Sequence, residues 1–248
     1  MKRLLLLLML LTPGLSAAEL TIAAASSYRP LLNHLAQQFE QRQQHQVRFV
    51  FGSSGKLATQ IIRGAPFDLI FSANMAYLKA LSDNDLLAGE VVTDGYGQLV
   101  LWSKSEAQLT AETDLVKLLQ QQRVAIAQPK HAPFGQAAKG YLEQQHIYHQ
   151  IQPNLVYSEN VAQAVHMVHS GAADFGFVAL SVIPLEQQSE TRMYRIALEN
   201  EALLRQAHAV LKSAKDKNLA NEFSRFVQRQ EFDEVKRHYG IEPERVKN

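Results

Sequence analysis

Short apolar runs and amphipathic helical patterns alternate along this chain, and this alternation strongly limits the folds it can adopt. The apolar runs have the length of strands, and the segments between them repeat apolar residues every three or four positions. Strands separated by helices pair mainly in parallel, with the helices covering the sheet. The predicted strands are 20–25, 47–51, 68–71, 99–102, 124–127, 154–157 and 175–179, and the predicted helices are 29–42, 57–63, 76–81, 113–121, 135–145 and 161–170, with more helix within 218–239. The pattern predicts an α/β fold.

Two segments have the character of connections between lobes. Residues 95–102 place flexible glycines directly before a strand, and residues 206–211 form a late strand just before the C-terminal helices. If the chain crosses at both places, lobe 1 contains residues 19–97 and 212–248, and lobe 2 contains residues 98–211. A chain of 248 residues is long enough for two such cores. We therefore predict two lobes joined by a hinge, each a mainly parallel sheet flanked by helices.

Residues 1–18 have the pattern of a cleaved secretory signal. Lys2 and Arg3 precede an almost entirely apolar run, and small residues occupy positions 16 and 18, just before the predicted cleavage site. The apolar run is too short to span a bilayer. The chain contains no cysteine, which excludes disulfides and a lipid anchor on an N-terminal cysteine. We expect an exported protein in the periplasm of a Gram-negative bacterium, with an extracellular location as the alternative.

The charged residues and histidines give no reason to expect a nucleic acid, a membrane surface or a metal ion as a partner. The chain has 25 Lys and Arg against 24 Asp and Glu, and a polyanion would require a clustered basic surface. Two histidine pairs, 146/149 and 166/169, are spaced to share a helix face, but neither belongs to an H-E-x-x-H motif. We expect surface histidines, no cofactor, and no metal held directly by side chains.

Four turns that follow predicted strands and open predicted helices form the candidate ligand site. These turns are residues 25–30, 52–55, 129–135 and 157–161. In open α/β sheets such turns converge beyond the carboxyl ends of the strands, and the first N–H groups of each helix attract anions. The first two turns contain no acid and carry Ser26, Ser27 and Ser54, which are hydroxyl donors unless they serve only as helix caps. The turns therefore predict a cleft that holds an anion.

A serine hydrolase is the alternative from a different functional class. Neither serine of Gly52-Ser53-Ser54-Gly55 fits the G-x-S-x-G elbow that presents a nucleophile. The sequence also identifies no histidine and acid to activate a serine. We therefore expect a binding protein and not an enzyme.

The motifs in these turns resemble those of the periplasmic molybdate-binding proteins of ABC importers. The matching segments are Ala-Ala-Ala-Ser at 23–26, Gly-Ser-Ser-Gly at 52–55, Gly-Ala-Pro-Phe-Asp at 64–68, Ser-Ala at 72–73, Ala-Pro-Phe-Gly at 132–135, Glu-Asn-Val at 159–161 and Gly-Ala-Ala-Asp-Phe-Gly-Phe-Val-Ala at 171–179. The resemblance implies a two-lobed type II periplasmic-binding fold that closes around a tetrahedral oxyanion. It also implies a monomer that delivers molybdate or tungstate to an ABC transporter permease in the inner membrane.

The same resemblance implies which residues contact the anion. Ser26 and Ser54 would supply hydroxyl and backbone donors from lobe 1. Ser27 falls where some members of the family have a polar side chain that also contacts the anion. Phe134 and Val161 would supply backbone N–H groups from lobe 2, so their side chains need not be polar.

One position departs from the pattern of the family. Ala179 stands where many members have a tyrosine whose hydroxyl reaches the anion, and we expect Ser27 to compensate. This departure leaves open the number of donors and the preference among oxyanions. Sulfate, phosphate or a small organic anion is an alternative cargo, although the few basic residues near the turns (Arg29, Lys56 and Lys130) argue against a large multiply charged ligand. A sensory role in place of transport is a further alternative.

Overall fold

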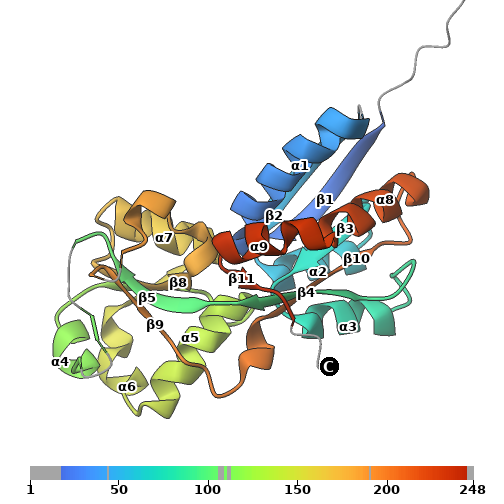
Figure 1. Ribbon diagram of the computed structural model, residues 1–248. Coiled ribbons are helices and arrows are strands. Elements are labelled where there is room, and N and C mark those ends of the chain that lie inside the picture. The colour runs from blue at the N-terminus through green and yellow to red at the C-terminus, as the bar shows by residue number, and fades with distance from the viewer. Residues whose placement is uncertain (1–17, 44, 106–108, 111–112, 190, 245–248) are drawn as a thin grey trace, which may run out of the picture.

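Two separate β-sheets form the centres of two lobes (Figure 1). The computed structural model describes residues 18–43, 45–105, 109–110, 113–189 and 191–244. Its strands are β1 (Glu19–Ala25), β2 (Gln46–Gly52), β3 (Leu69–Ser72), β4 (Val92–Gly97), β5 (Leu99–Ser103), β6 (Val124–Ala127), β7 (Leu155–Ser158), β8 (Phe175–Ala179), β9 (Met193–Arg195), β10 (Arg205–Val210) and β11 (Ile241–Glu242). Its α-helices are α1 (Arg29–Gln43), α2 (Ser54–Ile62), α3 (Met75–Asp83), α4 (Leu115–Leu119), α5 (Pro133–Gln144), α6 (Tyr148–Ile151), α7 (Val161–His169), α8 (Lys217–Val227) and α9 (Asp233–His238). The short 3₁₀ helices η1 (Ser26–Tyr28) and η5 (Glu201–Leu204) also bear on the argument below.

The sheet of lobe 1 has six strands in the order β11-β4-β10-β3-β1-β2, and that of lobe 2 has five in the order β7-β6-β8-β5-β9. β1 pairs in parallel with β2 and β3, and β6 pairs in parallel with β7 and β8. β10 runs antiparallel to β3 and β4, and β5 runs antiparallel to β8 and β9. The predicted α/β fold with two sheets is confirmed. Both sheets are nevertheless mixed, not mainly parallel, because the strands that connect the lobes run against their neighbours.

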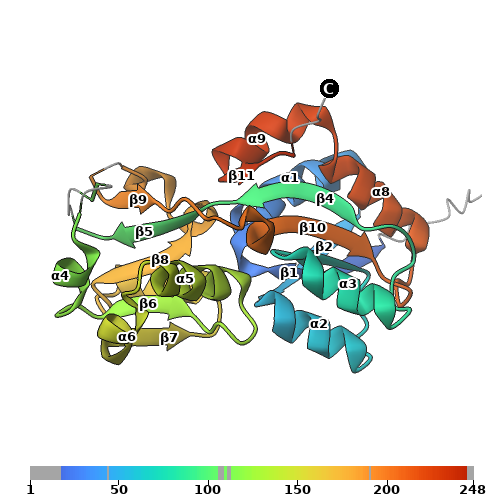
Figure 2. The same ribbon diagram turned by 90° about the horizontal axis from the view of Figure 1, so that it is seen from below.

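The chain crosses between the lobes twice (Figure 2). β4 in lobe 1 continues into β5 in lobe 2 with only Gln98 between them. The chain returns between β9 and β10, because β10 hydrogen-bonds to β3 and β4 in the sheet of lobe 1. The second crossing therefore lies before residue 205, whereas we expected lobe 2 to extend to residue 211.

Helices cover both faces of the lobe 1 sheet. Helix α1 buries one side of the sheet through the apolar positions that its spacing predicts, namely Leu31, Leu32, Leu35, Ala36 and Phe39. Phe223 of α8 packs edge-on against Phe39, with 5.1 Å between ring centroids. On the opposite face, α2 and α3 bury Leu57, Ile61, Leu78 and Leu81 against β-strand residues that include Ala23 and Ile70. The sheet is thus enclosed on both faces, and its strand ends are left to form the boundary with lobe 2.

The predicted signal segment, residues 1–18, lies outside the described residues except for Ala18. Within the described ranges, no helix has both the length and the apolar character needed to cross a bilayer.

Candidate functional site

A small cavity lies between the two lobes, where the ends of four strands meet. Lobe 1 contributes Ala25, Ser26, Ser27, Gly52, Ser53, Ser54 and Ala73 to its lining, and lobe 2 contributes Ala132, Pro133, Phe134 and Val161. The structure therefore brings all five predicted contact residues to one place, from the β1–η1, β2–α2, β6–α5 and β7–α7 junctions. The volume of the cavity is only about 10 Å³, because the two lobes are closed on each other.

Ser26, Ser27 and Ser54 of lobe 1 line this cavity, and all three residues are buried. Ser54 Oγ accepts the N–H of Ala73 at 3.0 Å, and Ser26 Oγ accepts the N–H of Ala162 of lobe 2 at 3.4 Å. In each case the hydroxyl oxygen acts as acceptor and its hydrogen stays available to a further acceptor. Within the described part of the chain, Ser27 Oγ has no hydrogen-bond partner although the residue is 0% exposed. A buried hydroxyl without a partner costs about 1–3 kcal/mol, so the site has more donors than the protein itself satisfies.

Helix N-termini face the cavity from lobe 2. Val161 is the first residue of α7, and the side chain of the preceding Asn160 caps the N–H of Gln163 at 3.1 Å. Phe134 follows Pro133 at the start of α5. The first four N–H groups of a helix have no acceptor within the helix, and proline at the first position contributes none. The N–H groups of Phe134 and Val161 are therefore donors of the kind that hold an anion.

Among the residues that the structure describes, those that line the cavity include no acidic and no basic side chain. An ion pair spans the lobes next to two of the turns, where Lys56 Nζ lies 3.1 Å from Glu159 Oε1 and both side chains are about half exposed. A multiply charged anion in the cavity would therefore be held by neutral donors and by the N-terminal ends of helices. Ala179, at the end of β8, does not line the cavity and supplies no donor.

The β6–α5 turn of lobe 2 contacts the start of α2 in lobe 1 through His131. The backbone N–H of Gly55 donates to the carbonyl of His131 at 2.9 Å, and Ser53 Oγ is hydrogen-bonded to His131 Nδ1 at 2.8 Å. A Cβ atom at position 55 would lie 2.9 Å from the His131 carbonyl oxygen. Glycine at this position therefore permits the lobes to approach closely enough to form these bonds.

Partial burial lowers the pKa of His131, and the positive charge of Lys56 lowers it further, while Glu159 acts in the opposite direction. The closed form therefore favours the neutral form of the His131 imidazole. Another polar contact, from Gln136 Nε2 to the hydroxyl of Tyr77 at 3.3 Å, joins α5 to α3 across the same boundary. The pair of lobes is thus held closed by contacts that surround the cavity.

A Ser-His-Asp set lies elsewhere, in the core of lobe 1. His208 Nδ1 is 2.8 Å from Asp94 Oδ1, and His208 Nε2 is 2.8 Å from Ser224 Oγ. This is the connectivity of a hydrolase triad, and sequence reasoning missed it because no motif links positions 94, 208 and 224. All three residues are buried, and none lines the cavity between the lobes. The set therefore lacks the access to substrate that a nucleophilic serine requires.

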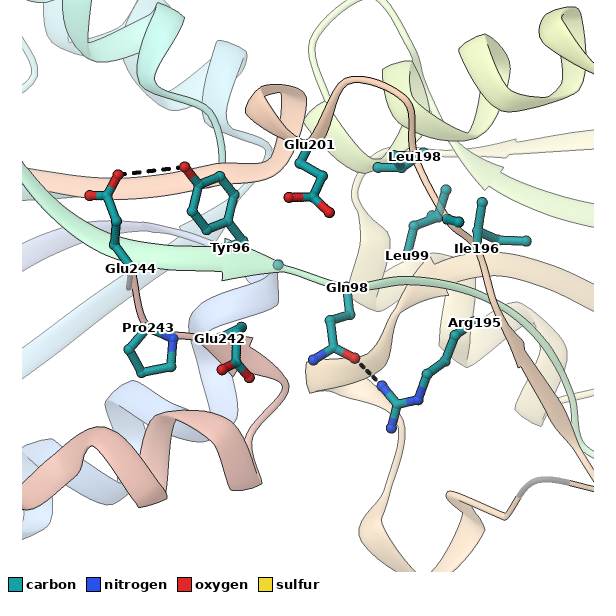
Figure 3. Close-up of a pocket in the computed structure, with 12 residues that line it drawn as sticks. Tyr96, Gln98, Leu99, Arg195, Ile196, Leu198, Glu201, Glu242, Pro243 and Glu244 are labelled. Carbon is teal, nitrogen blue, oxygen red and sulfur yellow. Dashed lines mark hydrogen bonds between the residues drawn. The ribbon is translucent and has the colours of Figure 1, made fainter. Parts of the chain in front are cut away.

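A second cavity, of about 700 Å³, lies at the hinge and contains none of the predicted site residues (Figure 3). The crossing segments line it through Tyr96, Gln98 and Arg195, and Glu244 enters from the C-terminal segment. Several of its side chains are hydrogen-bonded. Gln98 bonds to Arg195, and Glu244 bonds to Tyr96 and, at 2.7 Å, to Arg205 beside the cavity. These pairs tie the hinge segments together.

Comparison with known proteins identifies relatives over nearly the whole chain. The chain is 30% identical over 226 residues to the molybdate-binding protein ModA of Rhodobacter capsulatus, covering 91% of this chain and 88% of that protein. It is 33% identical over 175 residues to ModA of Azotobacter vinelandii, covering 70% and 69%. The solved structure of the periplasmic molybdate-binding protein of Azotobacter vinelandii matches with a TM-score of 0.85 at 26% identity, covering 91% of this chain and 100% of that one. The sulfate-binding protein SubI of Mycobacterium tuberculosis matches with a TM-score of 0.72 at 12% identity, over 91% and 87% of the two chains, and so shares the fold alone.

These relatives confirm the resemblance that the turn motifs predict, and they are solute-binding proteins. The family described as bacterial extracellular solute-binding protein matches residues 20–242. That range includes both sheets, both crossings and all four turns of the cavity. With its two-lobed type II periplasmic-binding fold, the chain belongs to the family of bacterial extracellular solute-binding proteins.

Proposed function

We propose that this protein captures molybdate by closing its two lobes around the anion. The observation that carries the proposal is the buried hydroxyl of Ser27, which has no partner among the described residues and belongs to a residue that lines the cavity together with neutral residues only. A tetrahedral oxyanion has only acceptor atoms and matches a site with only donors to offer. The names of the relatives at 30% and 33% identity support molybdate as that anion.

Donors from both lobes converge on the bound anion. Ser26, Ser27 and Ser54 offer hydroxyl hydrogens from lobe 1, and Phe134 and Val161 offer backbone N–H groups from lobe 2. A hydrogen bond to a charged group contributes about 1.5–3 kcal/mol, so several together exceed the cost of ordering and desolvation. An anion that bridges both sets favours the closed form, which is how hinged binding proteins respond to ligand. Donors at fixed positions also select by size, because a smaller sulfate cannot reach all of them at once.

Phosphate or sulfate is the second candidate for the ligand, and the residues that line the cavity help to distinguish these anions from molybdate. Phosphate carries a proton near pH 7 and so needs an acceptor, whereas the lining contains no carboxylate. Sulfate carries no proton and stays a competitor that only its size disfavours. The shared fold does not identify the ligand, because structures with the same fold include binding proteins for thiamin and iron.

The family and the sequence support a proposal for the wider role. Tungstate has the same shape and charge as molybdate, and we propose that it binds as well. Residues 1–18 direct export to the periplasm, where the closed, loaded monomer docks on an ABC transporter permease and releases its cargo. Capture and release of an unchanged anion require no catalysis, so we propose that the protein is not an enzyme.

A thermal-shift panel on the chain lacking residues 1–18 tests this proposal. Molybdate, tungstate, sulfate, phosphate and chromate are added separately to the ligand-free protein. A ligand at one hundred times its Kd stabilises the folded state by about 2.7 kcal/mol, which for a chain of this size raises Tm by about 5–10 °C. We expect that increase with molybdate and tungstate only. An increase with sulfate or phosphate alone would transfer the function to that anion, and no increase with any anion would refute anion capture.

Ser54→Ala gives a second test at a single donor. Removal of one charge-assisted hydrogen bond should lower molybdate affinity by about tenfold to a hundredfold, as measured by calorimetry. Ser82→Ala is the matched control, because Ser82 is exposed on α3 and does not line the cavity. Equal affinities of the two variants would remove Ser54 from the site.

A further inference from the structure

A buried hydrogen-bond network in lobe 1 converges on the carboxylate of Asp94. The hydroxyl of Tyr28 donates to Asp94 Oδ2 at 2.7 Å, and Gln228 Nε2 donates to Asp94 Oδ1 at 2.7 Å. His208 Nδ1 lies 2.8 Å from Asp94 Oδ1, and Ser224 Oγ completes the chain at His208 Nε2. A buried carboxylate is tolerated only when it is well hydrogen-bonded, and here three side chains provide those bonds. Such a network holds its members in one arrangement.

The network joins the two strands that carry the chain between the lobes. Asp94 lies on β4, which leads into lobe 2, and His208 lies on β10, which returns from it. These strands are neighbours in the sheet and extend side by side toward the lobe boundary (Figure 2). Any rotation of the lobes about the hinge therefore acts on strands that Asp94 and His208 tie together.

The third arm of the network reaches the turn next to the anion cavity. Tyr28 is the last residue of η1, the turn that carries Ser26 and Ser27. Among the described residues, no side chain caps the start of this turn, so the contacts of Tyr28 help to hold it in place. The Tyr28 ring packs edge-on against Phe71 at 5.3 Å, and its hydroxyl is bonded to Asp94. Burial and the neighbouring Asp94 charge raise the pKa of Tyr28 well above its ordinary value, so the hydroxyl keeps its proton and remains the donor.

We propose that Asp94, held by His208, is a positioning residue for anion binding: through the Tyr28 hydroxyl it fixes the Ser26–Ser27 turn against the two hinge strands. The inference rests on the proposed function, since it assigns a role within that same site. With the turn fixed in advance, the anion meets donors that are already in place, and little binding free energy is spent on ordering them. Without the hydrogen bond between Tyr28 and Asp94, the Ser26–Ser27 turn must be ordered each time the anion binds.

Tyr28→Phe and Ser224→Ala form a matched pair of variants, because each removes one buried hydroxyl from one end of the same network. Both should lower the Tm of the ligand-free protein by a few degrees. Tyr28→Phe should also lower molybdate affinity about fivefold to twentyfold, whereas Ser224→Ala should leave it within twofold. If both variants keep the affinity of the unaltered chain, or both lose it equally, the network has only a structural role and the proposal is wrong.

A double-mutant cycle tests whether Asp94 acts through Tyr28. Asp94→Asn should weaken molybdate binding, and adding Tyr28→Phe should weaken it no further, because both changes break the same link. Fully additive losses would overturn the assignment.

Amide hydrogen exchange of the ligand-free protein separates this proposal from the proposed function. Exchange at residues 26–28 should accelerate in Tyr28→Phe and not in Ser224→Ala. If the unaltered chain binds no molybdate, the proposed function fails, and exchange at these residues alone decides whether the network orders the turn. Unchanged exchange in Tyr28→Phe would contradict the positioning role in either case.

Discussion

Replacing Gly55 with alanine should weaken anion binding and leave the ligand-free protein at least as stable as before. Gly55 is the second residue of α2 and lies at the closest approach of the two lobes. A Cβ atom there would lie 2.9 Å from the carbonyl oxygen of His131 and 3.0 Å from its Cα. Both are backbone atoms of lobe 2 and cannot move aside as the end of a side chain can. The added methyl group therefore hinders closure of the two lobes by steric repulsion.

The two effects have opposite signs because they act on different states. Excess volume in a packed contact costs about 1–3 kcal/mol, and the contact with the His131 backbone exists only in the closed form. The methyl group would also lie 2.9 Å from Cε1 of Tyr77, which belongs to lobe 1, so this ring must turn aside in either form. A penalty of that size on the closed form lowers anion affinity about 5- to 150-fold. In the open form the lobes are apart at this point, and alanine is better than glycine in a helix by about 0.5–1 kcal/mol. The ligand-free protein can open, so its Tm should stay the same or rise.

Isothermal calorimetry with molybdate and thermal unfolding without ligand measure the two effects. Gly140→Ala is the matched control, because Gly140 is exposed on α5 and a Cβ there meets no atom within 4 Å. The control should raise Tm slightly and leave affinity unchanged. If Gly55→Ala binds molybdate as tightly as the unaltered protein, the contact between Gly55 and His131 is not part of the bound state and the reasoning fails.

Other substitutions address single contacts. Ser27→Ala should lower molybdate affinity about 10- to 100-fold with no loss of ligand-free stability, because its hydroxyl gives up no hydrogen bond within the described chain; a drop in Tm without a drop in affinity would contradict this. Asp68→Asn should lower the free energy of unfolding by about 2–4 kcal/mol in denaturant titrations and leave affinity unchanged, because the buried carboxylate accepts the N–H groups of Thr21 at 2.7 Å and Lys215 at 2.8 Å, far from the anion cavity. Burial lowers the pKa of His131, so the unfolded chain binds a proton on this imidazole more tightly than the folded chain does. The contribution of His131 to the free energy of unfolding should therefore be fully present above about pH 6.5, the ordinary pKa of histidine, and should be lost as the pH falls from that value toward the lower pKa of the folded chain. His131→Gln should flatten this part of the profile of unfolding free energy against pH, and an unchanged profile would exclude His131 as its source.

The four turns of the cavity could be predicted because local chemistry defines each of them. Pro30 and Pro133 mark helix starts, and Ser53-Ser54-Gly55 follows an apolar strand. The structure brings all of these turns together at one boundary, as the convergence of strand ends requires. Whether the five predicted residues contact an anion stays a prediction.

The strand β4 could not be predicted, because Val-Thr-Asp-Gly-Tyr-Gly contains three residues that disfavour strands. Its stability comes from distant partners: Asp94 bonds to His208, which is 114 positions away, and β10 and β11 pair on either side of it. The second crossing was misplaced for a related reason. An apolar run such as 206–211 reveals a buried strand, but its sequence does not say which of two sheets it enters.

The contacts across the cavity were equally beyond sequence reasoning. Ser53 and His131 are 78 positions apart, and nothing in either segment indicates that their side chains meet. The missing partner of Ser27 is likewise a property of the packed structure, since the sequence shows a serine but not its surroundings.

The position of β10 in the middle of the lobe 1 sheet has a consequence for the order in which the protein matures. The strands of lobe 2, β5 to β9, are contiguous in the chain, so this half can fold as soon as residue 195 has emerged. In lobe 1, β10 alone connects β4 and β11 to β3, β1 and β2. The N-terminal serine turns therefore depend on a strand that is synthesised near the end, a long-range pairing of the kind that slows folding. A chain interrupted before residue 205 would lack the central strand of the lobe 1 sheet and so have no competent anion site, so affinity for the ligand reports that β10 has been made and has paired.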